Sequence, residues 1–80
     1  MSKAKLGDWR WYVGCEEYDE EMMDSGTREA ALADGKRVYQ GDRFYLVEAR
    51  FSMADERAME RGDIDTAPFA ETRNGEWVKP

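Results

Sequence analysis

The chain has 80 residues, a formal net charge of -6 and a hydrophobic content of 41%. A chain of this length buries roughly 60–65% of its unfolded surface, which is enough for one core and excludes a second domain. The aromatic content, with three Trp, four Tyr and three Phe, excludes a disordered chain.

The first segments predict a tail and a β-hairpin. Residues 1–7 are mostly small and polar, so they predict a loose N-terminal tail on a single domain over 1–80. The side chains of residues 9–14, WRWYVG, alternate between two faces, which predicts a half-buried strand. The segment EEMMD, residues 20–24, predicts a short return strand, and the acidic CEEYD before it predicts the turn.

A helix is predicted over residues 28–39. Thr27 is a suitable N-cap, Glu29 places an anion in the first turn, and Gly41 supplies the C-terminal stop. Gly35 costs about 1 kcal/mol relative to Ala inside a helix. We attribute the presence of glycine at this position to close packing of the helix on a sheet that bears Trp and Phe. The expected buried face consists of Ala31, Leu32, Gly35, Val38 and Tyr39.

A central strand and a second helix are predicted next. RFYLVEARF, residues 43–51, is apolar on both faces at its start, which is typical of a central strand. Ser52, three residues before Asp55, resembles the start of a capping box. A short helix is therefore expected over 53–61, ending at Gly62.

The last segment predicts a second hairpin. Asn74-Gly75 lies between short alternating flanks, which is a strong hairpin signal, and Trp77 is its expected anchor. The order strand, strand, helix, strand, short helix, hairpin predicts an α+β fold. We expect a small, mainly antiparallel sheet with helix 28–39 packed on one face.

The residue types argue against an enzyme. The chain has no His, so the usual base for a Ser or Cys nucleophile is missing. The carboxylates around the single cysteine, Cys15, disfavour an anionic nucleophile there. A chain this short also has little room for a cleft that holds two carboxylates in different environments. We therefore expect no catalytic residues.

We also expect no cofactor, no metal site and no membrane segment. Zinc sites need more Cys or His, and neither EEYDEE nor GDID has EF-hand spacing. No apolar run approaches the roughly 18 residues of a membrane span, and MSKAKLGD lacks the apolar segment of a secretory signal. One cysteine fits a reducing compartment, so the expected location is the cytoplasm.

The negative charge is concentrated in one run. Residues 16–24 hold six carboxylates and no base, whereas the other residues hold 12 acidic and 12 basic side chains. Such crowding is unfavourable within a fold and indicates a binding surface, with an aromatic ring as anchor. A second, weaker patch spans residues 55–65. The predicted partner-binding residues are Glu16, Glu17, Tyr18, Asp19, Glu20, Glu21, Asp24, Asp55, Glu56, Glu60, Asp63 and Asp65.

Direct nucleic-acid binding is not expected. Aromatic residues on the predicted strands could stack on bases, but an acidic surface repels phosphate, and the chain has no glycine-rich phosphate loop. Carboxylates on a hairpin instead present negative charge at intervals comparable with those of a nucleic-acid backbone. This pattern predicts binding to a basic groove built for DNA or RNA.

The hairpin, helix and strand portion, residues 9–51, resembles small accessory proteins of phages and prophages, through the pieces TREAALADGKRVY and GDRFYLVEA. In size, acidity and lack of catalytic motifs the chain is similar to anti-CRISPR proteins. These families share no common motif, so no functional residue can be transferred. The resemblance implies a DNA mimic in the bacterial host cytoplasm, whose acidic residues face the DNA-binding channel of a CRISPR-Cas effector.

The leading hypothesis is therefore a nonenzymatic inhibitor, monomeric or a weak homodimer, that binds a basic surface of a nucleic-acid-binding protein. The alternative is a phage structural or host-interaction module that associates through apolar surface or sheet-edge pairing. A small domain that binds a metal through oxygen ligands is the third hypothesis.

Overall fold

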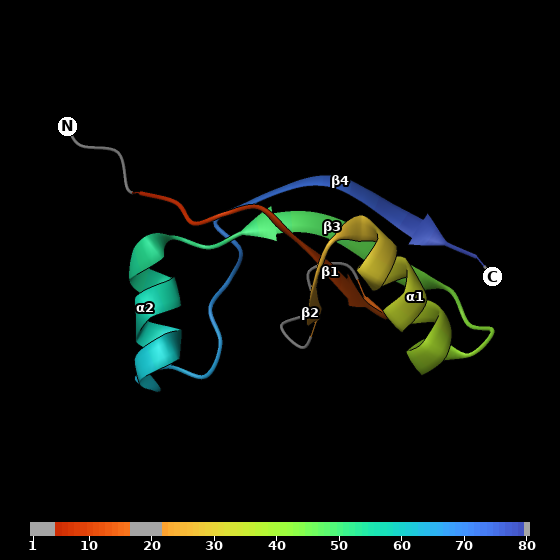
Figure 1. Ribbon diagram of the computed structural model, residues 1–80, viewed down its shortest axis with the longest axis horizontal. Helices are drawn as coiled ribbons and strands as arrows, with labels where there is room; N and C mark the ends of the chain where they lie inside the picture. The colour runs from red at the N-terminus through yellow and green to blue at the C-terminus, as the bar shows by residue number, and fades with distance from the viewer. Residues whose placement is uncertain (1–4, 17–21, 80) are drawn as a thin grey trace.

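The computed structural model describes residues 5–16 and 22–79 of the chain (Figure 1). The four strands form one antiparallel sheet in the order β2-β1-β3-β4. This is the predicted α+β fold, and both helices have their predicted bounds. The elements are β1 (Arg10–Gly14), β2 (Met23–Gly26), α1 (Arg28–Tyr39), β3 (Phe44–Arg50), α2 (Met53–Arg61) and β4 (Glu71–Val78).

Helix α1 begins where its N-cap predicts and lies across β1, β2 and β3. The hydroxyl of Thr27 accepts a hydrogen bond from the Ala30 backbone N–H at 3.2 Å. Gly35 is buried, and a Cβ there would lie 2.3 Å from the ring of Phe44. The expectation of close packing is therefore confirmed, because only glycine allows the helix to approach this ring.

The expected buried face of α1 is wrong at one position. Val38 is 42% exposed. In the last turn Tyr39 makes the contact with the sheet instead, because its ring stacks on Phe44 with 6.0 Å between centroids. Gln40 is the C-cap of helix α1, and the following Gly41 has a φ of 94°, which suits the predicted stop.

Strand β3 is an inner strand and is buried on both faces, as predicted. Phe44 and Leu46 point toward α1. Tyr45, Val47 and Ala49 point to the opposite face. Each face therefore has its own small apolar cluster, and β3 contributes to both.

The face opposite α1 is covered by individual aromatic side chains. Tyr12, Phe51 and Phe69 form a cluster with ring centroids 4.9–5.9 Å apart. Helix α2, which begins at the N-cap Ser52 and ends at Gly62, lies at one end of the sheet, away from α1 (Figure 1). None of its nine residues is buried. It therefore contributes little to the core.

The C-terminal hairpin prediction is wrong, because β4 is one continuous strand. Asn74 and Gly75 form a bulge opposite β3, at the point where the register between the two strands shifts. The positive φ of Asn74, 56°, is used to bend the strand rather than to reverse it. The ring of Trp77 lies 5.2 Å from that of Tyr45, so Trp77 packs against the sheet while remaining 40% exposed.

Two N-terminal boundaries also differ from expectation. Residues 5–7, expected in a loose tail, are hydrogen-bonded to the junction between β3 and α2. For example, the Gly7 N–H donates to the Phe51 carbonyl at 2.8 Å. The return strand, predicted over 20–24, occupies Met23–Gly26. Residues 1–4, 17–21 and 80 lie outside the described residues.

We expect Gly35→Ala to destabilise the protein. The clash with Phe44 should cost about 1–3 kcal/mol, which the gain of about 1 kcal/mol in helix propensity offsets only partly. Thermal unfolding would measure this as a fall in Tm of about 4–8 °C for each kcal/mol lost. Lys36→Ala, at an exposed neighbouring position, is the control and should leave Tm unchanged or slightly raised. A rise in Tm for Gly35→Ala would contradict the close contact.

Candidate functional site

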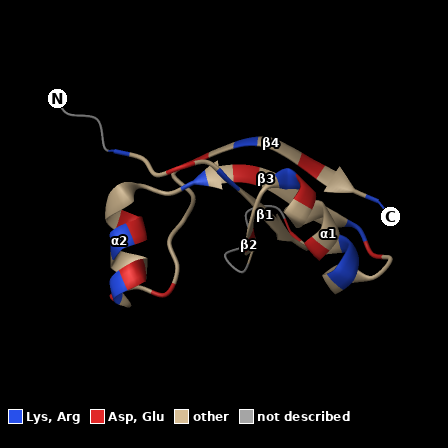
Figure 2. Ribbon diagram, viewed as in Figure 1, with Lys and Arg blue, Asp and Glu red and all other residues tan. Residues whose placement is uncertain are grey.

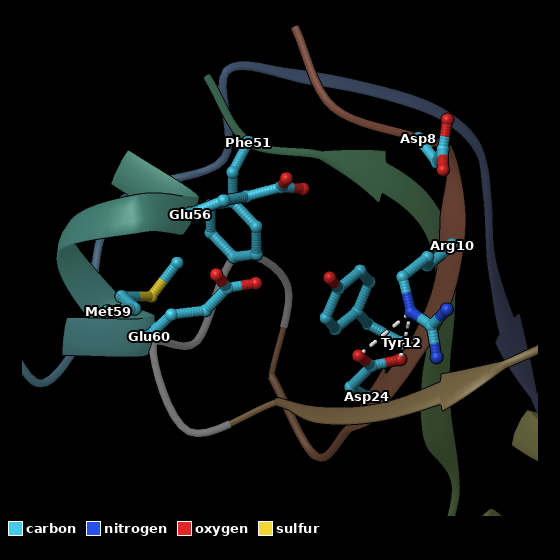
Figure 3. A pocket seen from close by; sticks show the side chains of 8 residues that line it. All are labelled: Asp8, Arg10, Tyr12, Asp24, Phe51, Glu56, Met59 and Glu60. Carbon is cyan, nitrogen blue, oxygen red and sulfur yellow. Dashed lines mark hydrogen bonds and ion pairs between the residues drawn. The ribbon is translucent and has the colours of Figure 1, made fainter. Parts of the chain in front are cut away.

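A cleft of about 380 Å³ lies between the sheet and helix α2 (Figure 3). Its walls come from three parts of the chain: strand β1 and the residues before it, strand β2, and the segment from the end of β3 through helix α2. The lining residues are Asp8, Arg10, Tyr12, Asp24, Phe51, Glu56, Met59 and Glu60.

Local periodicity orients each of these side chains. Arg10 and Tyr12 are two residues apart on β1, so both point to the face opposite α1. Glu56, Met59 and Glu60 have i, i+3 and i+4 spacing on α2, which places them on one side of the helix. The cleft forms because this side of α2 faces Arg10 and Tyr12.

The cleft is strongly acidic. Arg10 is already bound: its Nε lies 2.9 Å from both carboxylate oxygens of Asp24, and this hydrogen bond raises the pKa of Arg10. The carboxylates of Asp8, Glu56 and Glu60 form no ion pair with any described residue. Four acidic side chains against one basic side chain leave a formal charge of -3 in the cleft.

Outside the cleft, the described residues hold ten acidic and ten basic side chains, so their formal charges cancel. Both signs of charge occur on the helices and strands (Figure 2), and some of these residues pair across β3 and β4. Arg73 pairs with Glu48 at 2.8 Å and Arg50 with Glu71 at 2.9 Å. The charge imbalance that the structure describes is therefore local to the cleft.

Tyr12 gives the cleft a polar group on an otherwise apolar wall. It is only 6% exposed, and Figure 3 shows its oxygen directed into the space beside α2. Among residues 5–16 and 22–79, no group forms a hydrogen bond with this hydroxyl. Burial, aided by the nearby charge of Asp24, raises the pKa of Tyr12 to about 12. The phenol is therefore neutral at physiological pH.

The predicted binding residues are only partly brought together. Asp24, from the first acidic run, shares the cleft with Glu56 and Glu60, from the second patch. Glu16 is exposed just beyond β1. Asp55, Asp63 and Asp65 belong to the same helix and its following loop but do not line the cleft, and Asp63 pairs with Arg61 at 2.9 Å. Glu17, Tyr18, Asp19, Glu20 and Glu21 lie outside the described residues.

Sequence reasoning missed more than half of the lining. The residues it did not select are Asp8, Arg10, Tyr12, Phe51 and Met59. The two-residue period of β1 and the four-residue spacing of Glu56 and Glu60 were visible as signals. Neither signal shows that the strand and the helix face each other.

Other kinds of site receive no support from the described residues. Within residues 5–16 and 22–79, no group of three or more Cys, Asp or Glu is arranged to hold a metal ion. The described helices include none long and apolar enough to cross a membrane. Cys15 is an exposed free thiol. Comparison with protein-family models, curated proteins and solved structures found no match to this chain.

We expect the raised pKa of Tyr12 to make stability fall at alkaline pH. The folded state holds the phenol proton up to about pH 12, whereas the unfolded chain releases it near pH 10. This contribution is complete below pH 10, declines between these values and amounts to roughly 2 kcal/mol. Denaturant unfolding across this range should show a steeper decline for the wild-type protein than for Tyr12→Phe. Equal slopes would show that the phenol ionises normally in the fold.

Proposed function

We propose that the protein is a nonenzymatic inhibitor that uses the acidic cleft and its surroundings to occupy a basic, nucleic-acid-binding surface of another protein. The observation that carries this proposal is the convergence of unpaired carboxylates from separate segments, Asp8 on one side and Glu56 and Glu60 on the other. The candidate partner is a CRISPR-Cas effector in the bacterial cytoplasm, as implied by the resemblance to anti-CRISPR proteins.

Electrostatics supports a basic partner. Like charges around one cleft repel one another, and this repulsion opposes folding. Lys or Arg side chains of a partner would relieve it. Complementary charge would also speed association, and the effect would weaken as salt screens it over a Debye length of about 10 Å at 0.1 M.

The size of the protein makes the cleft the centre of a wider contact. A stable interface buries about 800 Å² on each partner, which is about one seventh of the 5655 Å² surface of this chain. A contact of that size extends beyond the cleft onto neighbouring acidic residues. Asp55 is on α2, which forms one wall of the cleft, and Asp63 and Asp65 are exposed in the loop after it, so in the proposed complex the second predicted patch forms the rim.

Blocking a nucleic-acid channel needs no chemistry from the inhibitor. It needs negative charge held on a folded surface, so that basic residues meant for phosphate are occupied. In the proposed complex with a CRISPR-Cas effector, the carboxylates of the cleft face the DNA-binding channel and prevent target DNA from entering.

The alternative, a module that associates through the edge of its sheet, is favoured by one observation. Strand β4 is eight residues long and lies at the edge of the sheet. However, it contains the bulge at Asn74 and carries Glu71, Arg73 and Glu76. Bulges and charged side chains are features that disfavour edge-to-edge pairing. The acidic cleft is therefore the better-supported site.

The test compares two variants with the same change in charge. Glu56→Gln/Glu60→Gln alters the cleft, whereas Glu29→Gln/Asp42→Asn alters exposed positions on α1 and the loop after it. Each protein would compete with target DNA for purified CRISPR-Cas effectors in a gel-shift assay. We expect the cleft variant to lose at least about tenfold in inhibition, or 1.4 kcal/mol, and the control variant to retain it.

Three results would count against the proposal. An equal loss in both variants would show that net charge, not the cleft, drives binding. Inhibition that persists at high salt would favour the apolar or sheet-edge module. If no effector binds the wild-type protein, the CRISPR-Cas partner is wrong. A parallel variant, Glu16→Gln/Glu17→Gln/Glu20→Gln/Glu21→Gln, tests the first acidic run separately, and circular dichroism would confirm that all variants fold.

A further inference from the structure

We propose that the cleft between β1 and α2 is a pocket for a single arginine side chain of the partner. This inference rests on the proposed function, because it names the group that the acidic cleft would take. It adds a specific geometry: a cationic head held between carboxylates, and an apolar stem against an aromatic wall.

The polar groups of the cleft suit a guanidinium. Glu56 and Glu60 offer carboxylates from α2, Asp8 offers one from the strand side, and the hydroxyl of Tyr12 lies between them (Figure 3). A guanidinium has five N–H donors in a planar fork and can reach acceptors on several sides. A lysine ammonium is a compact charge with three donors on one nitrogen, so it would form hydrogen bonds with fewer of these acceptors.

The hydroxyl of Tyr12 adds a polar acceptor to the cleft. Tyr12 is 6% exposed as a whole residue, and its hydroxyl oxygen is on the part that faces the open cleft. No described residue forms a hydrogen bond with this oxygen. The phenol oxygen can accept a hydrogen bond from a guanidinium N–H, which would satisfy it.

The apolar wall suits the stem of the same side chain. Phe51 and Met59 face the cleft beside the ring of Tyr12, and arginine covers apolar surface with its methylene groups while its head stays with polar partners. Aromatic faces and methionine also accept cationic and irregular ligands well. A volume of about 380 Å³ is near the lower end of the roughly 300–1,000 Å³ range of ligand pockets. The cleft therefore has room for one arginine side chain.

Two arginines of the chain are already held in this way. The guanidinium of Arg73 pairs with Glu48 through two contacts, at 2.8 and 3.2 Å, and stands 3.9 Å from the ring centroid of Trp9. Arg50 likewise stands over Trp9 at 4.6 Å while it pairs with Glu71 at 2.9 Å. A carboxylate together with an aromatic ring is thus the environment of two arginines in this structure, and the cleft offers both kinds of group, with Arg10 the one basic side chain among its described lining residues.

The test uses a small probe and needs no partner protein. N-acetyl-arginine methylamide would be titrated into the labelled protein while NMR follows the backbone amides and the Tyr12 ring. The matched control is the citrulline analogue, which has nearly the same shape without the charge. We expect saturable shifts around the cleft with a dissociation constant on the order of 1 mM for the arginine probe. Affinity should be at least about fivefold weaker for the citrulline and lysine probes.

Two variants locate the binding. Glu60→Gln and Tyr12→Phe should each weaken the arginine probe by about threefold to tenfold, because each removes one acceptor and leaves the shape of the cleft intact. Asp42→Asn, which changes an exposed residue outside the cleft by the same charge, should not. Equal binding of arginine and citrulline, shifts outside the cleft, or no saturable shift would each overturn the proposal.

The outcomes separate this inference from the proposed function. If the arginine probe binds in the cleft but no basic protein is inhibited, the pocket is real and the inhibitor function is wrong. If the effector is inhibited through Glu56 and Glu60 but the probe does not bind, the inhibitor function stands and the arginine pocket is wrong.

Discussion

The burial of β3 on both faces is the constraint on which the rest of this fold depends. A strand with apolar side chains on each side of the sheet must be covered on both faces. Among the described residues, α1 is the helix that packs on the sheet. Helix α1 does this by bringing Gly35 directly onto Phe44. The opposite face is closed by separate side chains, Tyr12, Phe51 and Phe69 among them. Helix α2 has no buried residue and lies at the end of the sheet. The cleft is the space between α2 and the sheet.

Because few side chains cover this face of the sheet, Tyr12 belongs both to the core and to the wall of the cleft. Its ring belongs to the core cluster beneath the sheet, while its oxygen reaches the cleft and keeps its proton because the surroundings disfavour a phenolate. A larger protein can separate its core from its binding site by several layers of side chains. Here one residue is in contact with both, so changes in the cleft and changes in core packing are expected to affect each other.

The charged residues of β3 and β4 differ in their pairing from those around the cleft. Along β3 and β4, acidic and basic residues face each other across the strands, and these pairs keep an exposed sheet edge charged and soluble. Around the cleft, by contrast, Asp8, Glu56 and Glu60 have no basic partner among the described residues. Like charges gathered around one cleft work against stability, whereas the described residues outside the cleft hold equal numbers of acidic and basic side chains.

The sequence by itself determined the features that depend on neighbouring residues. The bounds of both helices follow from caps at Thr27 and Ser52, and the two-faced burial of β3 follows from its alternation. Only the tertiary structure decided whether Asn74-Gly75 reverses the chain or bends it. A positive φ occurs in hairpin turns and in β-bulges alike, and the pairing of β4 with β3 makes this one a bulge. The cleft is likewise tertiary. Asp24 and Glu60 are far apart in the chain. Both line the cleft because β1 pairs with β2, while the Gly7 backbone N–H donates to the carbonyl of Phe51 just before α2. Spacing along a chain shows which side chains share a face of one element, but long-range pairing decides which faces meet.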